Sequence, residues 1–219
     1  MIRSQDIARQ IFTESDAVTT GHFVGTSGKH LDAYVAKDRV YTYPTKVETL
    51  VKRMALELPD HLEIEVVVGP AIGAVCLSQL LALELGKLRY REIRSVWTEK
   101  KGDGDLTLAR GFDKIVAGKK ILVVEDIVNT GGSVMETITA VRNASGYVVG
   151  VSSLVNRGSA TKETFGLRSL EFFQALWTVR MEAYNPEDCP MCREKVPVNT
   201  DRGHGEKFLK SPEWRKIYG

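Results

Sequence analysis

The most informative run of residues in this chain is Ile121-Leu122-Val123-Val124-Glu125-Asp126-Ile127-Val128-Asn129-Thr130-Gly131-Gly132-Ser133-Val134. Its four leading apolar residues predict a buried parallel strand, because both faces of such a strand are covered and its sequence need not alternate. Two carboxylates follow where this strand is expected to end, and a small, hydroxyl-rich turn then leads into a helix with apolar residues at Val134, Ile138 and Val141. A strand that feeds a Gly-rich turn and a helix favours phosphate binding, since free backbone N–H groups and the helix dipole point at the anion. The carboxylates suit a polyol's hydroxyls or a hydrated cation, so the segment predicts a site for ribose 5-phosphate.

Length and composition set limits on the class of protein. A chain of 219 residues can bury a full core in one domain with a small appendage. The net charge of +2 gives no electrostatic case for a nucleic-acid partner or a membrane surface. No apolar run approaches the roughly 20 residues of a spanning helix, and the polar residues 1–6 lack a signal-peptide core. Three cysteines do not make a disulfide framework, so we expect a reducing cytoplasm.

Apolar periodicity predicts strands that alternate with helices. Helices are expected at residues 4–12, 45–58, 74–85 and 133–143, and strands at 33–35, 64–68, 94–97, 120–124, 147–155 and 170–176. The stretch 21–30 is predicted to be irregular or hairpin-like, and the polar stretch 98–109 fits neither period. The alternation predicts an α/β fold whose parallel sheet is flanked by helices.

Polar or glycine-rich clusters follow four of the predicted strands. They are Gly69-Pro70, Glu99-Lys100-Lys101, Glu125-Asp126 and Asn156-Arg157. Ligands of parallel sheets bind at the carboxyl ends of the strands, so these clusters are expected to converge on one edge.

The segment from Glu125 to Ser133 resembles the phosphoribosyl pyrophosphate (PRPP) signature of type I phosphoribosyltransferases. The order of strand, acidic pair, Thr-Gly-Gly-Ser and helix is more specific than a lone Gly-rich loop. A plain tight turn with its acids in solvent is the competing interpretation, but such a turn needs no acidic pair beside four apolar residues. The segment lacks the G-x-x-x-x-G-K-[ST] order of a P-loop and the G-x-G-x-x-G of a dinucleotide fold.

The resemblance implies a role for each cluster. Ribose and 5′-phosphate would be bound by Glu125, Asp126, Asn129, Thr130, Gly131, Gly132 and Ser133, and pyrophosphate by Gly69, Pro70, Ala71, Ile72, Gly73 and Lys100. The residues expected to be catalytic are Lys100, Lys101 and Asp126, with both lysines on a loop that could close as a lid or could be a solvated charge run. Mg²⁺ would be the cofactor, carried by PRPP with no direct protein ligand. Arg110 could bind phosphate or pair with an acid.

Three features are similar to the orotate branch of this family. They are the N-terminal hood that covers the base (Ser27-Gly28-Lys29-His30 and 33–35), the loop edges at 99–101 and 108–112, and Arg157 after the strand 147–155. The base would be contacted by Arg157, Asn129 and Lys29; a guanidinium matches orotate's carboxylate bidentately. The resemblance implies transfer of ribose 5-phosphate from PRPP to orotate, giving orotidine monophosphate and pyrophosphate, by a homodimer. A purine or other salvage base, or an inactive PRPP sensor, remains open, because Asn129, Thr26 and Gly73 depart from residues common in the family.

The division predicted from the sequence is a phosphoribosyltransferase domain at 1–180, including a hood at about 1–45, and a C-terminal extension at 181–219. The extension holds Cys189-Pro190-Met191-Cys192, which is half of a four-ligand zinc site. His204 could supply a third ligand, or a second subunit another pair. A redox pair and two ordinary turn cysteines are the alternatives.

Overall fold

The structure of the chain is a computed structural model that describes residues 3–25, 27–102, 104–158, 160–167 and 172–212. The chain divides into two compact units. The core unit contains Met1–Arg9 and Tyr43–Val179, and the hairpin unit contains Gln10–Thr42 and Arg180–Gly219. Gln10–Thr42, which is most of the predicted hood, therefore lies in one unit with the predicted C-terminal extension, whereas the sequence assigned the hood to the larger domain.

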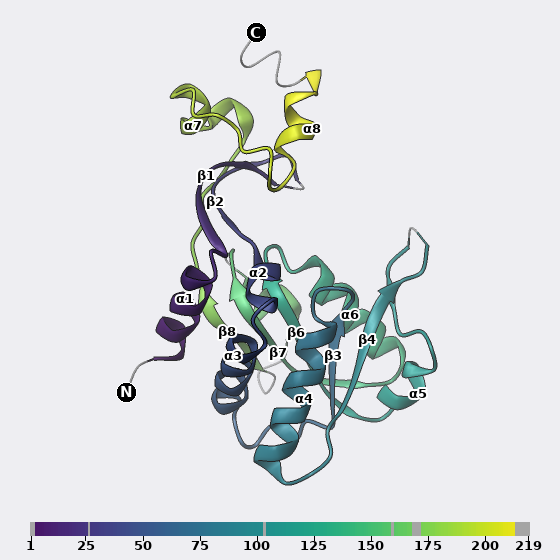
Figure 1. Cartoon of the computed structure of the whole chain (residues 1–219). Helices are drawn as coiled ribbons and strands as arrows, with labels where there is room; N and C mark the ends of the chain where they lie inside the picture. Colours follow the sequence, from purple (N-terminus) through teal and green to yellow (C-terminus); the bar gives the residue numbers. More distant parts are fainter. Residues whose placement is uncertain (1–2, 26, 103, 159, 168–171, 213–219) are drawn as a thin grey trace. The chain divides into compact units, whose positions relative to one another are not determined.

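The core unit is built on a six-stranded sheet in the order β5-β4-β3-β6-β7-β8 (Figure 1). The strands are β3 (Val66–Pro70), β4 (Arg94–Lys100), β5 (Leu106–Thr107), β6 (Lys120–Val128), β7 (Tyr147–Asn156) and β8 (Phe172–Thr178). All neighbours are parallel except β4 and β5, which are antiparallel. The predicted α/β class with a parallel sheet is confirmed.

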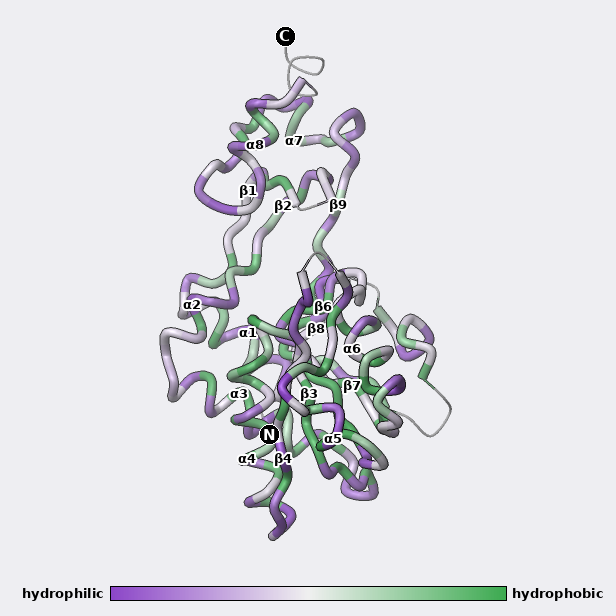
Figure 2. Tube along the Cα trace, turned by 90° about the vertical axis from the view of Figure 1, so that its right-hand side faces the viewer, coloured by the Kyte–Doolittle hydropathy of each residue, from purple (hydrophilic) through white to green (hydrophobic). Residues whose placement is uncertain are grey.

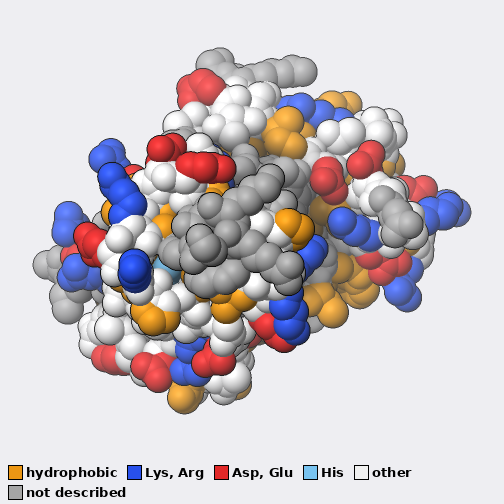
Figure 3. Space-filling model, turned by 90° about the horizontal axis from the view of Figure 1, so that it is seen from above, with side chains coloured by type: hydrophobic (Ala, Val, Ile, Leu, Met, Phe, Trp, Pro, Cys, Tyr) orange, Lys and Arg blue, Asp and Glu red, His pale blue; other side chains and the backbone are white. Residues whose placement is uncertain are grey.

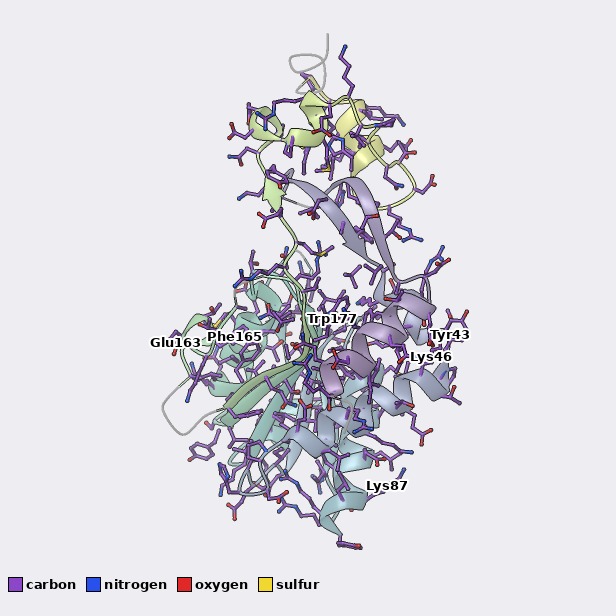
Figure 4. The ribbon with its side chains drawn as sticks, turned by 90° about the vertical axis from the view of Figure 1, so that its left-hand side faces the viewer. Tyr43, Lys46, Lys87, Glu163, Phe165 and Trp177 are labelled. Atoms are coloured by element: carbon purple, nitrogen blue, oxygen red, sulfur yellow. The ribbon has the colours of Figure 1, made fainter. Side chains whose placement is uncertain are left out.

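Helices cover both faces of this sheet. α3 (Pro44–Glu57) and α4 (Val75–Arg89) pack on one face, and α6 (Gly132–Asn143) packs on the other with α5 (Phe112–Val116). Hydrophobic colour runs along the central strands in Figure 2, as expected where helices cover both faces. α3 begins at Pro44, and Lys46 lies 4.8 Å over the ring of Tyr43 at this end, where Figure 4 labels both residues.

In the core unit, two predictions about elements were wrong and one α-helix was missed. β6 does not end at Val124 but continues through the acidic pair to Val128, because β7 pairs with it as far as Val128↔Asn156. The stretch 98–109 is not irregular throughout, since β4 extends to Lys100 and pairs with β5. The short α5 was not predicted at all. Residues 170–171 of the last predicted strand lie outside the described residues.

The strand order places a switch in direction between β3 and β6. The chain passes from β3 to β4 on one side and then returns to β6 on the other side of β3. Pairing between β3 and β6 ends at Val68↔Val123. In sheets of this kind the crevice beyond the strands' carboxyl ends at such a point is where ligands bind.

The hairpin unit is a three-stranded antiparallel sheet in the order β1-β2-β9. Its elements are β1 (Val18–Val24), β2 (His30–Val35), α2 (Lys37–Tyr41), β9 (Ala183–Tyr184), a 3-10 turn (Pro186–Asp188), α7 (Pro190–Arg193) and α8 (Gly205–Leu209). The first helix, α1 (Ser4–Glu14), contributes residues to both units. On the other edge of the hairpin, His22 forms a parallel bridge with Val198. The C-terminal segment therefore borders both edges of the N-terminal hairpin.

The surface carries mixed charge. On the face shown in Figure 3, acidic and basic side chains are interspersed rather than separated by sign. Within the described part of the chain, no helix combines the length and the apolar character that crossing a membrane requires.

Candidate active site

The acidic pair lies within β6 at the switch point. Only 7% of Glu125 and 5% of Asp126 is exposed. Each carboxylate accepts a backbone N–H of the next residue, from Asp126 to Glu125 Oε1 at 3.0 Å and from Ile127 to Asp126 Oδ1 at 2.5 Å. These contacts hold the buried carboxylates in place within β6, so the interpretation of two solvated acids beside a plain turn is wrong.

The turn after β6 presents the uncapped end of α6. Gly131, the residue before the helix, has φ +86° and no side chain to cap the first turn. The first intrahelical bond runs from the Met135 N–H to the Gly131 carbonyl, so the N–H groups of residues 132–134 point out of the helix end. With the helix dipole, these N–H groups have the arrangement that favours an anion, and phosphate binding at this helix end stays a prediction. The side chains of Thr130 and Ser133 are exposed beside it.

A buried phenylalanine supports this turn from beneath. A Cβ added to Gly131 would lie 2.7 Å from Cε1 of Phe165. Phe165 is fully buried in a 3-10 turn (Glu163–Phe165), labelled in Figure 4, and its ring packs edge-on against Phe173 at 5.0 Å. No local pattern in the sequence indicates this contact. Two separate reasons therefore require glycine at position 131: its positive φ, and the lack of room for a Cβ beside the Phe165 ring.

The predicted pyrophosphate loop joins β3 to α4 and is held by backbone contacts. A Cβ on Gly69 would lie 2.6 Å from the carbonyl oxygen of Ala74, so the turn closes only with glycine. The Ala71 N–H donates to the Thr98 carbonyl of β4 at 2.7 Å, and the Ala71–Ile72 peptide bond is cis. Ile72 is 91% exposed, so the loop projects from the sheet edge.

Lys100 and Lys101 lie at the outer end of the β4–β5 hairpin, and both are exposed. Lys100 pairs with Leu106 across the hairpin and follows Thr98, which accepts the bond from the pyrophosphate loop. Arg110 forms an ion pair with Glu99 at 3.1 Å across the base of this segment. The structure thus favours the ion-pair alternative for Arg110, and the role of Lys100 and Lys101 at the pyrophosphate loop stays a prediction.

Backbone contacts bring the predicted base-binding residues Arg157 and Asn129 together. The Arg157 N–H donates to the Val128 carbonyl at 2.8 Å, and a Cβ on Gly158 would lie 2.5 Å from the Asn129 carbonyl oxygen. Asn156, which is buried, shapes the turn by accepting the Gly158 N–H at 3.2 Å and donating to the Ala160 carbonyl at 2.9 Å. Asn156 is a positioning residue of this turn.

Lys29, the third residue predicted to contact the base, belongs to the hairpin unit. It lies in the turn between β1 and β2, where its carbonyl accepts the Gly25 N–H at 2.8 Å. Together with residues of the C-terminal segment it lines a cavity of about 520 Å³ within that unit. Its role at the base stays a prediction.

We expect Gly131→Ala to impair binding at the α6 end more than it impairs folding. Holding alanine at this φ costs about 1–3 kcal/mol, and the buried Phe165 ring forces the turn to move. Isothermal titration calorimetry should show PRPP affinity lowered by about tenfold or more, and chemical denaturation should show the stability loss.

Gly118→Ala is the matched control. Gly118 has φ +70° with no atom within 4 Å of an added Cβ, and it lies before β6, at the opposite end of the strand. It should lose stability and keep PRPP affinity. Equal PRPP affinity in the two variants would contradict the role given to the turn.

Comparison with known proteins agrees with this geometry. The family model of the phosphoribosyl transferase domain matches residues 41–182. Orotate phosphoribosyltransferase of Caldicellulosiruptor bescii is 40% identical over 195 residues, which cover 89% of this chain and 95% of the relative. The enzyme of that name from Thermotoga maritima is 36% identical, covering 91% of this chain and 99% of the relative.

Solved structures show the same fold. Orotate phosphoribosyltransferase of Mycobacterium tuberculosis, solved with Fe(III) dicitrate, has a TM-score of 0.61 and 26% identity, covering 80% of this chain and 96% of that chain. Orotate phosphoribosyltransferase of Aeropyrum pernix has a TM-score of 0.62 and 20% identity, covering 79% of this chain and 93% of that chain. With its PRPP signature at the switch point of the sheet, the chain belongs to the type I phosphoribosyltransferase family, among relatives named orotate phosphoribosyltransferase.

Proposed function

We propose that this chain transfers ribose 5-phosphate from PRPP to orotate, giving orotidine 5′-monophosphate and pyrophosphate. The bond between C1′ and the pyrophosphate oxygen breaks, and a bond from C1′ to a ring nitrogen of orotate forms. The observation that carries the proposal is the buried acidic pair followed by an uncapped helix end at the switch point. The relatives with 35–40% identity over most of the chain carry this activity in their names.

The ribose phosphate is bound by β6 and the turn after it. Glu125 and Asp126 accept hydrogen bonds from the ribose hydroxyls, because an ionised carboxylate is an acceptor only. The N–H groups at the α6 end and the hydroxyls of Thr130 and Ser133 donate to the 5′-phosphate oxygens. Holding the sugar in this way fixes C1′ relative to the incoming base, which lowers the entropic part of the barrier.

Pyrophosphate gathers negative charge as it leaves. The backbone of residues 69–73 and the ammonium groups of Lys100 and Lys101 stabilise this charge, Lys100 being the nearer to the loop along β4. The acidic pair supplies hard oxygen donors that suit the hydrated Mg²⁺ accompanying PRPP, which adds positive charge on the pyrophosphate when bound. Closure of the β4–β5 hairpin would exclude water during transfer.

The base is selected at the turn after β7. Arg157 pairs its guanidinium bidentately with the orotate carboxylate, and the neighbouring Asn129 contacts the ring. Lys29 is proposed as a further contact to the base. The proposal includes a homodimer that works in the cytoplasm with Mg²⁺, consistent with three cysteines that form no disulfide.

The direct test is product formation with a panel of bases. With PRPP and Mg²⁺, orotate should yield orotidine 5′-monophosphate and pyrophosphate in equal amounts, measured by chromatography and a coupled pyrophosphate assay. Adenine, guanine, hypoxanthine and uracil should yield little. Turnover of a purine in place of orotate would contradict the choice of base, and PRPP binding without turnover of any base would indicate a sensor.

Removing one of the proposed contacts to the ribose phosphate should weaken PRPP binding while the fold remains. Asp126→Asn keeps the acceptor for the Ile127 N–H but loses the charge, and Thr130→Val loses the hydroxyl. A hydrogen bond to a charged group contributes about 1.5–3 kcal/mol, so calorimetry should show PRPP affinity lowered by about tenfold or more in each.

Matched substitutions away from the site serve as controls. Asp60→Asn changes an exposed carboxylate before β3, and Thr139→Val changes an exposed hydroxyl in the second half of α6. Both controls should bind PRPP like the original chain. If Asp126→Asn and Thr130→Val bind PRPP as tightly as these controls, the proposed contacts to the ribose phosphate are wrong.

Arg157→Lys should weaken the binding of orotate and leave the binding of PRPP unchanged. Lysine keeps the positive charge but not the two parallel N–H donors, so the KM for orotate should rise about tenfold while the PRPP dissociation constant stays unchanged. Arg110→Lys is the control, since Arg110 pairs with Glu99. An unchanged orotate KM in Arg157→Lys would show that another group reads the carboxylate.

A further inference from the structure

Four side chains with metal-ligand atoms meet inside the hairpin unit. They are His22, His30, Cys189 and Cys192; their ligand atoms all lie within 4.8 Å of one another and all four residues are buried. His22 and His30 come from the N-terminal hairpin, and both cysteines come from the C-terminal extension. Local patterns show only the C-x-x-C half of this group.

The hairpin geometry explains why the two histidines share a face. β1 and β2 are out of step between Thr20 and Phe23, where β1 carries one extra residue, and beyond this bulge Val24 lies opposite His30. Directly opposed residues project to the same face, and His22 is two residues before Val24, so it projects to that face as well. A bulge that re-aims a side chain is a common device beside functional sites.

The hydrogen bonds of His22 favour the tautomer whose Nε2 lone pair can bind a metal. Its Nδ1 lies 2.8 Å from the Val196 carbonyl oxygen, which can only accept, so the neutral ring carries its proton on Nδ1. The lone pair of Nε2 therefore points into the cluster, 2.7 Å from His30 Nδ1. A ligating histidine that donates its other N–H to a carbonyl is the usual arrangement around protein-bound zinc.

The two cysteines bring the number of potential metal-ligand atoms in the cluster to four. Cys192 Sγ lies 3.1 Å from His30 Nδ1 and 3.6 Å from His22 Nε2, and Cys189 Sγ lies 3.7 Å from the same Nε2. Tetrahedral zinc with bonds of about 2.0–2.3 Å separates its ligand atoms by roughly 3.3–3.8 Å. To reach that geometry the two histidine nitrogens, 2.7 Å apart, must separate, and the ligand atoms that lie up to 4.8 Å apart must approach one another.

We propose that His22, His30, Cys189 and Cys192 bind one structural Zn²⁺. Two thiolates with two imidazoles in a closed four-ligand set are typical of structural zinc, and leave no open position for chemistry. On binding, the two thiols release their protons to solvent, and the neutral histidines release none. His204 is exposed and lies outside the cluster, so the alternatives of His204 or a second subunit as the missing ligands are not needed.

Burial argues against the other interpretations of the C-x-x-C pair. Neither cysteine is in a disulfide, and their exposures are 0% for Cys189 and 6% for Cys192, so a redox partner has little access. Two ordinary turn cysteines would not require two buried histidines against them. The apolar cluster around Val24, Val198 and Phe208 in this unit is small, and a metal that joins the hairpin to the C-terminal segment would supply the stability that such a unit needs.

The first test uses the unmodified protein. Purified from zinc-supplemented medium, it should hold one zinc ion per chain by inductively coupled plasma mass spectrometry. After exchange for Co²⁺, absorption should show tetrahedral d–d bands and thiolate-to-cobalt charge transfer. With zinc bound, only the exposed Cys76 should react rapidly with a thiol reagent, and all three cysteines should react after treatment with a strong chelator.

Substitutions then assign the ligands. Cys192→Ser, His22→Gln and His30→Asn should each lose the stoichiometric zinc, the amides being chosen to keep a polar atom where Nε2 or Nδ1 stood. Cys76→Ser, His61→Gln and His204→Gln change exposed residues outside the cluster and should retain it. If a ligand variant fails to fold, the cobalt spectrum of the unmodified chain still decides the question.

The outcome is independent of the proposed transferase reaction. Asp126→Asn should lose PRPP affinity and keep zinc, which also excludes metal held by the acidic pair. Absence of stoichiometric zinc together with absence of a thiolate–cobalt spectrum would overturn the proposal. Zinc retained at full stoichiometry in Cys192→Ser would overturn it as well.

Discussion

The parallel pairing of β3 with β6 is the constraint on which the site depends. It places the loop after β3 beside the acidic pair within β6, because the pairing stops at Val68↔Val123, and ligands of such sheets bind in the crevice beyond a switch point of this kind. The proposed function needs both clusters, because it assigns the pyrophosphate to one and the ribose phosphate to the other. The helix that follows β6 then directs its N–H groups at the same crevice.

Much of the fold and the signature could be predicted from the sequence, because apolar runs, glycine turns and helix periodicity are local. The end of β6 was misplaced because the acidic pair looks like the end of a strand, whereas pairing of Glu125 with Ser153 of β7 carries the strand onward. The support of Gly131 by Phe165 and the approach of Gly158 to Asn129 could not be predicted. Both contacts join segments distant in sequence, and neither leaves a local pattern.

The metal-ligand cluster of the hairpin unit also depends on contacts between residues distant in sequence, which local patterns do not reveal. The sequence supplied the C-x-x-C pair but no way to choose its partners, since His22 and Cys189 are separated by 167 positions. A strand bulge, a carbonyl acceptor and pairing of β9 with β2 bring the four donors together. We thus propose two separate tasks for the chain: phosphate chemistry at the carboxyl ends of the central parallel strands, and metal-dependent stabilisation of the hairpin unit.

The most direct test of the central claim is a crystal structure of the chain with PRPP and Mg²⁺. The 5′-phosphate is expected within hydrogen-bond distance of the N–H groups at residues 132–134, the ribose hydroxyls on Glu125 and Asp126, and the pyrophosphate against residues 69–73. Density for PRPP at another place on the chain, with the end of α6 bare, would contradict that claim.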